Sequence, residues 1–184
     1  MTYFYKFLVL LSLVAPPFIM VDYGHFQYNC VSLGLTVLAA TCLLFNQTAI
    51  CAFFFTLAVH HKQMSLYHAI PFFCHLTGTL IMKKVDLLST FRVAVTILST
   101  VGLMWLPFGD YWIYPFRRVF PLQRGVYEDK VGSFWYALDR VYPLKKNFTD
   151  ERMAQICGIT TLLFVLPSAI NHFIKASNVV WFHS

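Results

Sequence analysis

Residues 153–173 read MAQICGITTLLFVLPSAINHF, a stretch without any aspartate, glutamate, lysine or arginine. A helix needs about 20 predominantly apolar residues to cross the roughly 30 Å of hydrocarbon in a bilayer, and this stretch is long enough. The whole chain has the same character, because 58% of its 184 residues are hydrophobic and only 12% are charged. So few polar side chains cannot coat a water-soluble globule, and the sequence therefore predicts a membrane protein.

Five other apolar runs precede this stretch. The six candidate membrane segments together are residues 7–21, 30–45, 48–59, 64–82, 91–108 and 153–173. Helices satisfy their own backbone hydrogen bonds in lipid, and the runs are too continuous for the alternating strands of a membrane barrel. We therefore expect an all-α, polytopic membrane helical bundle of about six transmembrane segments, forming a single domain over residues 1–184. The third run is short, and a tilted or re-entrant segment stays open as an alternative to a full crossing.

A long polar segment, 109–152, separates the last two runs. It mixes eight basic and six acidic residues with several tyrosines and tryptophans, a composition typical of a chain lying at headgroup level. If successive runs cross the membrane in alternate directions, this long segment lies on the same side as the shorter segments 22–29 and 60–63. Because the positive-inside rule favours a cytoplasmic position for the basic residues of the opposite side, we expect segment 109–152 to be luminal or interfacial. Those basic residues are Lys6, Lys83, Lys84, Arg92 and Lys175.

The net charge of +6 does not indicate a nucleic-acid partner. The basic residues are scattered along the chain, and the helices between them are expected to lie in lipid. We therefore expect membrane lipid, and not DNA or RNA, to supply the anions that these residues meet.

The segment 22–29, DYGHFQYN, is the first dense group of polar side chains. It places a carboxylate, an imidazole and two amides between two apolar runs, on Asp22, His25, Gln27 and Asn29. Carboxylates and amides are the groups that bind sugar hydroxyls, while aromatic faces pack against the ring. The alternative interpretation is a polar turn that satisfies helix ends.

A second polar group, HHKQ at 60–63, lies between the third and fourth runs. The ammonium of Lys62 either reaches the membrane surface or contacts a phosphate, and Gln63 beside it offers an amide. Neighbouring residues on a helix point in different directions, so His60 and His61 do not predict a zinc site.

A third polar group is Arg117-Arg118 followed by RGVYEDKVGSFW at 124–135. Arg124 offers a planar fork that matches phosphate oxygens, and Glu128, Asp129 and Lys130 could position it or bind hydroxyls. An amphipathic helix on the membrane surface is the alternative. Because all three polar groups are expected on one side of the membrane, a phosphate and a sugar could be held there together.

Four strings in this chain carry a family resemblance. They are VDYGHFQYN at 21–29, HHKQMSLYHAIPFF at 60–73, WLPF at 105–108 and RVFPLQRGVYEDKVGSFW at 118–135. In this order they resemble the central part of the dolichyl-phosphate-glucose α-1,3-glucosyltransferases that build the lipid-linked oligosaccharide. The resemblance covers roughly residues 9–135 and is closer to the enzyme that adds the first glucose than to the enzyme that adds the second.

The resemblance implies a multi-pass hexosyltransferase of the GT-C type in the endoplasmic reticulum membrane. Such an enzyme moves glucose from dolichyl-phosphate-glucose to the terminal mannose of a dolichyl-diphosphate-linked high-mannose oligosaccharide, with inversion at the anomeric carbon. The expected partners are this donor, this acceptor and membrane lipid, and no metal or other cofactor is expected.

The same resemblance leaves the catalytic residue unknown. The family's base is an aspartate of a GDYE-like motif that would precede residue 1, and its later His-Glu-Lys motif would follow the sixth run. We therefore expect a truncated form; a catalytically inactive fragment or scaffold and a small transporter component are the alternatives. The residues expected to bind substrate are Asp22, His25, Gln27, Asn29, Lys62, Gln63, Arg124, Glu128, Asp129 and Lys130.

Overall fold

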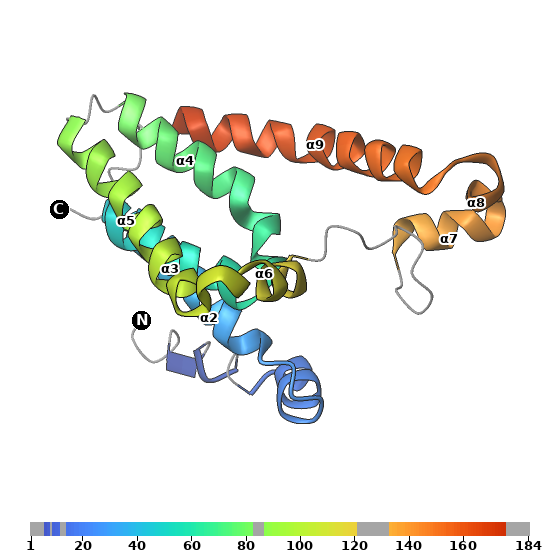
Figure 1. Cartoon of the computed structure of the whole chain (residues 1–184), viewed down its shortest axis with the longest axis horizontal. Coiled ribbons are helices and arrows are strands. Elements are labelled where there is room, and N and C mark those ends of the chain that lie inside the picture. Colours follow the sequence, from blue (N-terminus) through green and yellow to red (C-terminus); the bar gives the residue numbers. More distant parts are fainter. Residues whose placement is uncertain (1–5, 8, 12–13, 83–86, 121–132, 176–184) are drawn as a thin grey trace.

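The computed structural model describes residues 6–7, 9–11, 14–82, 87–120 and 133–175, and every regular element within them is a helix (Figure 1). The longer helices are α2 (Asn29–Leu44), α3 (Thr48–His61), α4 (Ala69–Met82), α5 (Leu87–Trp105) and α9 (Asp150–Lys175). The shorter ones are η1 (Phe18–Tyr23), η2 (Gln63–His68), η3 (Leu106–Tyr111), α6 (Ile113–Val119), α7 (Phe134–Val141) and α8 (Leu144–Asn147). The prediction of an all-α fold is confirmed for the described part of the chain.

Two of the described helices are long and apolar enough to cross a membrane. They are α5 with its continuation η3, Leu87–Tyr111, and α9, Asp150–Lys175. Both coincide with predicted runs, 91–108 and 153–173. The apolar helices α2 and α3 lie on two further runs but are shorter.

Helices α2 and α3 form an antiparallel hairpin. Asn46 in the turn between them has a φ of 58°, a left-handed conformation that asparagine adopts more readily than most residues. Helix α3 also packs against α5. The buried contact residues are small, among them Ala39, Ala52 and Ala58. Small side chains allow helix backbones to approach closely, which is how membrane helices pack in the absence of a hydrophobic driving force between them.

Helix α9 packs along α4, and Figure 1 shows both helices running toward the same side of the molecule. At the other end of α9, the side chain of Met153 is completely buried beside Leu144. Four further side chains pack against these two. They are Trp135 and Leu138 of α7, Phe148 directly after α8, and Ile156 of α9. The predicted polar segment 109–152 therefore contains short helices, one group of which packs on the start of α9.

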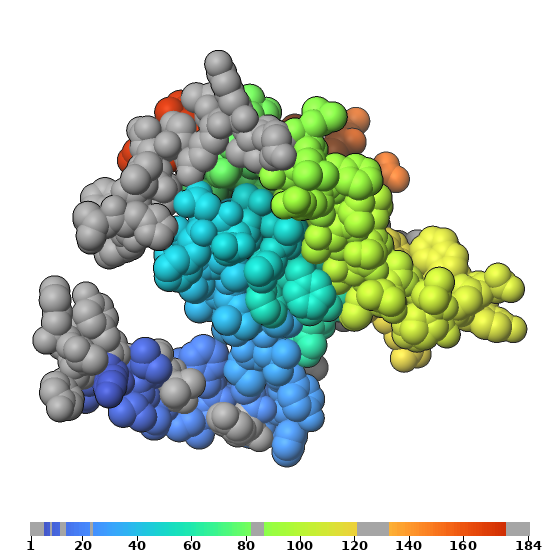
Figure 2. Space-filling view, turned by 90° about the vertical axis from the view of Figure 1, so that its left-hand side faces the viewer, coloured from blue at the N-terminus to red at the C-terminus, as the bar shows by residue number. Residues whose placement is uncertain are grey.

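Aromatic rings connect the beginning of this polar segment to the helix bundle. The ring of Trp105 lies 5.6 Å from that of His60 and 5.6 Å from that of Phe116 on α6, centroid to centroid. In the space-filling view of Figure 2, α5, η3 and α6 (yellow-green to yellow) lie on the side away from the blue N-terminal helices. The exposed Arg117 and Arg118 belong to this outer surface.

The chain contains two N-glycosylation sequons, Asn46-Gln47-Thr48 and Asn147-Phe148-Thr149. Glycosylation at one or the other reports which side of the membrane it faces. Asn147 is exposed at the end of α8, whereas Asn46 is exposed in the tight turn between α2 and α3. If segment 109–152 is luminal, microsomal expression yields a glycosidase-sensitive mobility shift that Asn147→Gln abolishes and Asn46→Gln leaves intact. A shift that depends on Asn46 instead reverses the orientation.

The cluster around Met153 predicts a local stability effect. Met153→Ala leaves a cavity and is expected to lower the free energy of opening α7 and α8 by about 2 kcal/mol, at the low end for such truncations. Amide hydrogen exchange in α7 should then accelerate about 30-fold. Ile159→Ala, which truncates an exposed side chain on the same helix, is the control and should leave the exchange rate in α7 unchanged.

Candidate functional site

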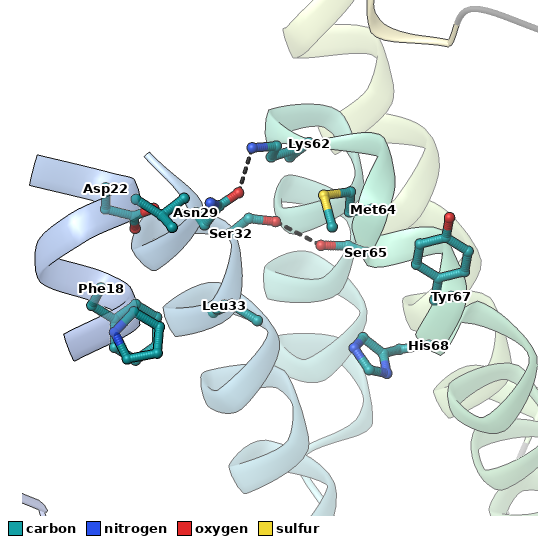
Figure 3. Close-up of a pocket in the computed structure, with 12 residues that line it drawn as sticks. Phe18, Asp22, Asn29, Ser32, Leu33, Lys62, Met64, Ser65, Tyr67 and His68 are labelled. Atoms are coloured by element: carbon teal, nitrogen blue, oxygen red, sulfur yellow. Dashed lines mark hydrogen bonds between the residues drawn. The ribbon is translucent and has the colours of Figure 1, made fainter. Parts of the chain in front are cut away.

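A pocket with several polar side chains in its lining lies where the start of α2 meets the end of α3 and η2 (Figure 3). Its volume is about 430 Å³, within the size range of small-molecule sites in proteins. Apolar residues of the N-terminal helix and of α2 form one wall, including Phe18 and Leu33. The polar lining comes from Asp22, Asn29, Ser32, Lys62, Ser65, Tyr67 and His68.

Lys62 connects two of the predicted polar groups. Its backbone is extended, with φ −151° and ψ 124°, and this conformation ends α3. The Lys62 ammonium donates hydrogen bonds to the side-chain oxygen of Asn29 and, at 3.2 Å, to the carbonyl oxygen of Gln27. The half-buried Lys62 ammonium therefore links the segments 22–29 and 60–63, as Figure 3 shows for Lys62 and Asn29.

The carboxylate of Asp22 lies at the beginning of α2. Its side chain is 5% exposed, and Oδ2 accepts a hydrogen bond from the backbone N–H of Cys30 in the first turn of that helix. Burial raises the pKa of Asp22, but hydrogen bonds from Cys30 and Asn29 outweigh this effect and hold the pKa below its usual value. Its other oxygen, Oδ1, is buried and accepts no hydrogen bond from the described residues.

Two serines form the floor of the pocket. The hydroxyl oxygens of Ser32 and Ser65 are 2.6 Å apart, and Ser32 also donates to the carbonyl of Ala58 at 3.3 Å. Both serines are buried, so these bonds join α2, α3 and η2 in the interior. Neither serine was predicted from the sequence as a site residue. Their signal was a small hydroxyl residue inside or beside an apolar run, a common feature of contacts between membrane helices.

Three of the remaining predicted site residues, His25, Gln27 and Gln63, are described by the structure but do not line the pocket. His25 is exposed, and Gln27 contributes its main-chain carbonyl and not its amide to the contact with Lys62. Gln63 begins η2 and is half-buried, next to the lining residues Lys62 and Met64. The others lie outside the described residues, namely Arg124, Glu128, Asp129 and Lys130.

The histidines near the pocket do not assemble a metal centre. His60 faces the aromatic side, since its Nδ1 lies 2.7 Å from the carbonyl oxygen of Thr56 and its ring neighbours those of Trp105 and Phe120. In the part of the chain that the structure describes, no three histidine, cysteine or acidic side chains gather in a way that could hold a metal ion. The pocket offers the ammonium of Lys62, the carboxylate of Asp22 and several hydroxyls, together with the amide of Asn29 and the imidazole of His68.

The sequence model of the ALG6, ALG8 glycosyltransferase family matches residues 4–183. The chain belongs to this family. The match confirms the resemblance inferred from the four strings and extends it past residue 135.

Curated members from animals and fungi are similar to almost the whole chain. The "Probable dolichyl pyrophosphate Man9GlcNAc2 alpha-1,3-glucosyltransferase" of Drosophila melanogaster is 39% identical over 180 residues, which is 94% of this chain and 38% of the fly protein. The Schizosaccharomyces pombe protein of the same name is also 39% identical, over 90% of this chain and 34% of its own length. The chicken protein "Dolichyl pyrophosphate Man9GlcNAc2 alpha-1,3-glucosyltransferase" is 34% identical over 90% of this chain. The chain thus spans a little over a third of the length of the relatives that it matches.

The lowered pKa of Asp22 predicts a pH dependence at the start of α2. A carboxylate whose pKa is lower in the folded state stabilises that state at pH values above its unfolded pKa, about 3.9, and the stabilisation is lost as the pH falls below it. Protection of the Cys30 amide against hydrogen exchange, corrected for the intrinsic rate, should therefore fall below about pH 4. Asp22→Asn should remove this dependence, whereas Asp150→Asn, in the first turn of α9, should preserve it. An unaltered pH profile in Asp22→Asn contradicts the assignment.

Proposed function

We propose that this chain forms part of the donor-binding region of an α-1,3-glucosyltransferase. In this proposal, glucose passes from dolichyl-phosphate-glucose to a dolichyl-diphosphate-linked high-mannose oligosaccharide, in the pathway of protein N-glycosylation. The contact between Lys62 and Asn29 carries the proposal, because it joins the strings VDYGHFQYN and HHKQMSLYHAIPFF in one pocket. The names of the curated relatives describe the same linkage on a Man9GlcNAc2 glycan.

The pocket offers complementary groups for a phosphate-linked sugar. The Lys62 ammonium suits a phosphate oxygen and stabilises the negative charge that grows on the dolichyl phosphate as it leaves. The buried Oδ1 of Asp22 can accept a hydrogen bond from a sugar hydroxyl, which would satisfy an acceptor that the described residues leave unpaired. The apolar wall that includes Phe18 and Leu33 suits the isoprenoid chain.

Other residues enter the proposal through the family resemblance. Arg124, Glu128, Asp129 and Lys130 would contact donor or acceptor from the segment 109–152, and His25, Gln27 and Gln63 would act beside the pocket. The inverting reaction needs a base that deprotonates the attacking mannose hydroxyl as the phosphate departs. We assign that base to no residue of this chain, and Asp22 is placed as a substrate contact only.

We also propose a multi-pass arrangement with about six crossings in the endoplasmic reticulum membrane. The start of α2, the end of α3 and η2, which leads into α4, meet at the pocket, and His60 contacts Trp105 at the end of α5. The helices therefore alternate in direction, as successive membrane crossings do. Helices as short as α2 and α3 are accommodated by local thinning of the bilayer. The pocket would face the lumen.

The test uses a chimera in which this chain replaces the matched 180 residues of the fly protein. With labelled dolichyl-phosphate-glucose and the unglucosylated lipid-linked glycan, Lys62→Ala is expected to lower kcat/KM for the donor at least tenfold, because a hydrogen bond to a charged group is lost. Arg124→Ala should act in the same direction. Lys146→Ala removes an exposed lysine from α8 and is the matched control.

Two results would contradict the proposal. Unchanged donor kinetics in both Lys62→Ala and Arg124→Ala would refute the site. A monodisperse chimera that transfers no glucose, beside an active fly enzyme, would refute the function.

A further inference from the structure

A second pocket, of about 450 Å³, lies between α2, α4 and the end of α9. Its apolar lining includes Leu43 and Leu44 of α2 and Phe72 of α4. The rings of His75 on α4 and His172 on α9 meet in an edge-on, T-shaped arrangement across the helix contact, with centroids 6.1 Å apart. The polar side chains that border the pocket are His68, His75, Asn171, His172 and Lys175.

The described side chains that line this pocket include a positively charged lysine and no negatively charged residue. Among the described residues that border the pocket there is no aspartate or glutamate, while Lys175 and the imidazoles supply hydrogen-bond donors. A basic residue in the last turn of a helix is favoured by the helix dipole, which accounts in part for His172 and Lys175. It does not account for His75, which lies in the middle of α4 and meets His172 from another helix. Ionisable side chains within apolar helices mark functional sites.

The surroundings of the pocket are those of a lipid-facing groove. Leu44 at its border is 60% exposed, and Ile174 on the last turn of α9 is also exposed. The alternate threading of the chain puts Lys175 toward the cytoplasmic side, while the border residue His68 lies toward the pocket at Lys62. Basic pockets between membrane helices on that side bind the phosphates of anionic lipids.

We propose that this second pocket binds an anionic phospholipid of the bilayer. The phosphate contacts Lys175, His172 and His75, and an acyl chain lies on Leu43, Leu44 and Phe72. The occupant is a phospholipid and not the glucosyl donor, because the pocket is separate from the Asp22–Lys62 site and shares only its border residue His68 with it.

The test measures how tightly the 184-residue chain retains phosphatidylinositol, by native mass spectrometry from nanodiscs of phosphatidylcholine and phosphatidylinositol. Lys175→Gln is expected to weaken retention about fivefold, and Lys175→Arg to preserve it. Arg152→Gln removes the same charge from the exposed opposite end of α9 and should have no effect. Helical circular dichroism and gel-filtration elution identical to those of the unsubstituted chain establish that each variant is folded.

Three results would overturn the proposal. Retention that is unchanged in Lys175→Gln, or that falls equally in Arg152→Gln, leaves general attraction to a basic protein as the cause. Dolichyl phosphate that displaces phosphatidylinositol at much lower concentration, in a manner that Lys175→Gln abolishes, assigns the pocket to the isoprenoid lipid instead.

Discussion

The hydrogen bonds of the Lys62 ammonium hold together the part of the structure on which the functional interpretation depends. A lysine between two apolar helices is costly unless it reaches water or finds acceptors, and here the side chain of Asn29 and the carbonyl of Gln27 provide them. The contact fixes the start of α2 against the end of α3. The serine pair beneath it and the carboxylate of Asp22 are arranged around that junction. The bond links the two polar segments directly, and the Ser32–Ser65 pair holds the same helix ends together in the interior.

Much of this fold could be predicted from the sequence, because backbone groups in lipid must pair within the helix that carries them. Runs 30–45, 48–59 and 153–173 each coincide with one helix to within a few residues. The short helices of segment 109–152 were not predicted. Helices of this length are marginal on their own and depend on tertiary contacts, such as that of Leu144 with Met153, which local periodicity does not reveal.

The site was predictable where side chains stand out chemically. Asp22, Asn29 and Lys62 are conspicuous between apolar runs, and the structure places all three in one pocket. Ser32 and Ser65 are not conspicuous, because only the packing of α2 on η2 makes them neighbours. Closeness in sequence can also mislead. His60 precedes Lys62 by two residues, yet its ring lies beside those of Trp105 and Phe120 and not in the pocket. Segment 124–130 lies outside the described residues, so its place relative to the pocket stays a prediction.

The central claim is that the pocket between Asp22, Asn29 and Lys62 holds the glucosyl donor. A dolichyl-phosphate-glucose analogue with a photoreactive group next to its phosphate tests this most directly, when it is crosslinked to the chain in microsomes and the labelled peptides are identified. The account predicts labelling within residues 17–33 and 62–68 that unmodified dolichyl-phosphate-glucose suppresses. Competed labelling confined to α9 or α7, with none in those two segments, would contradict it.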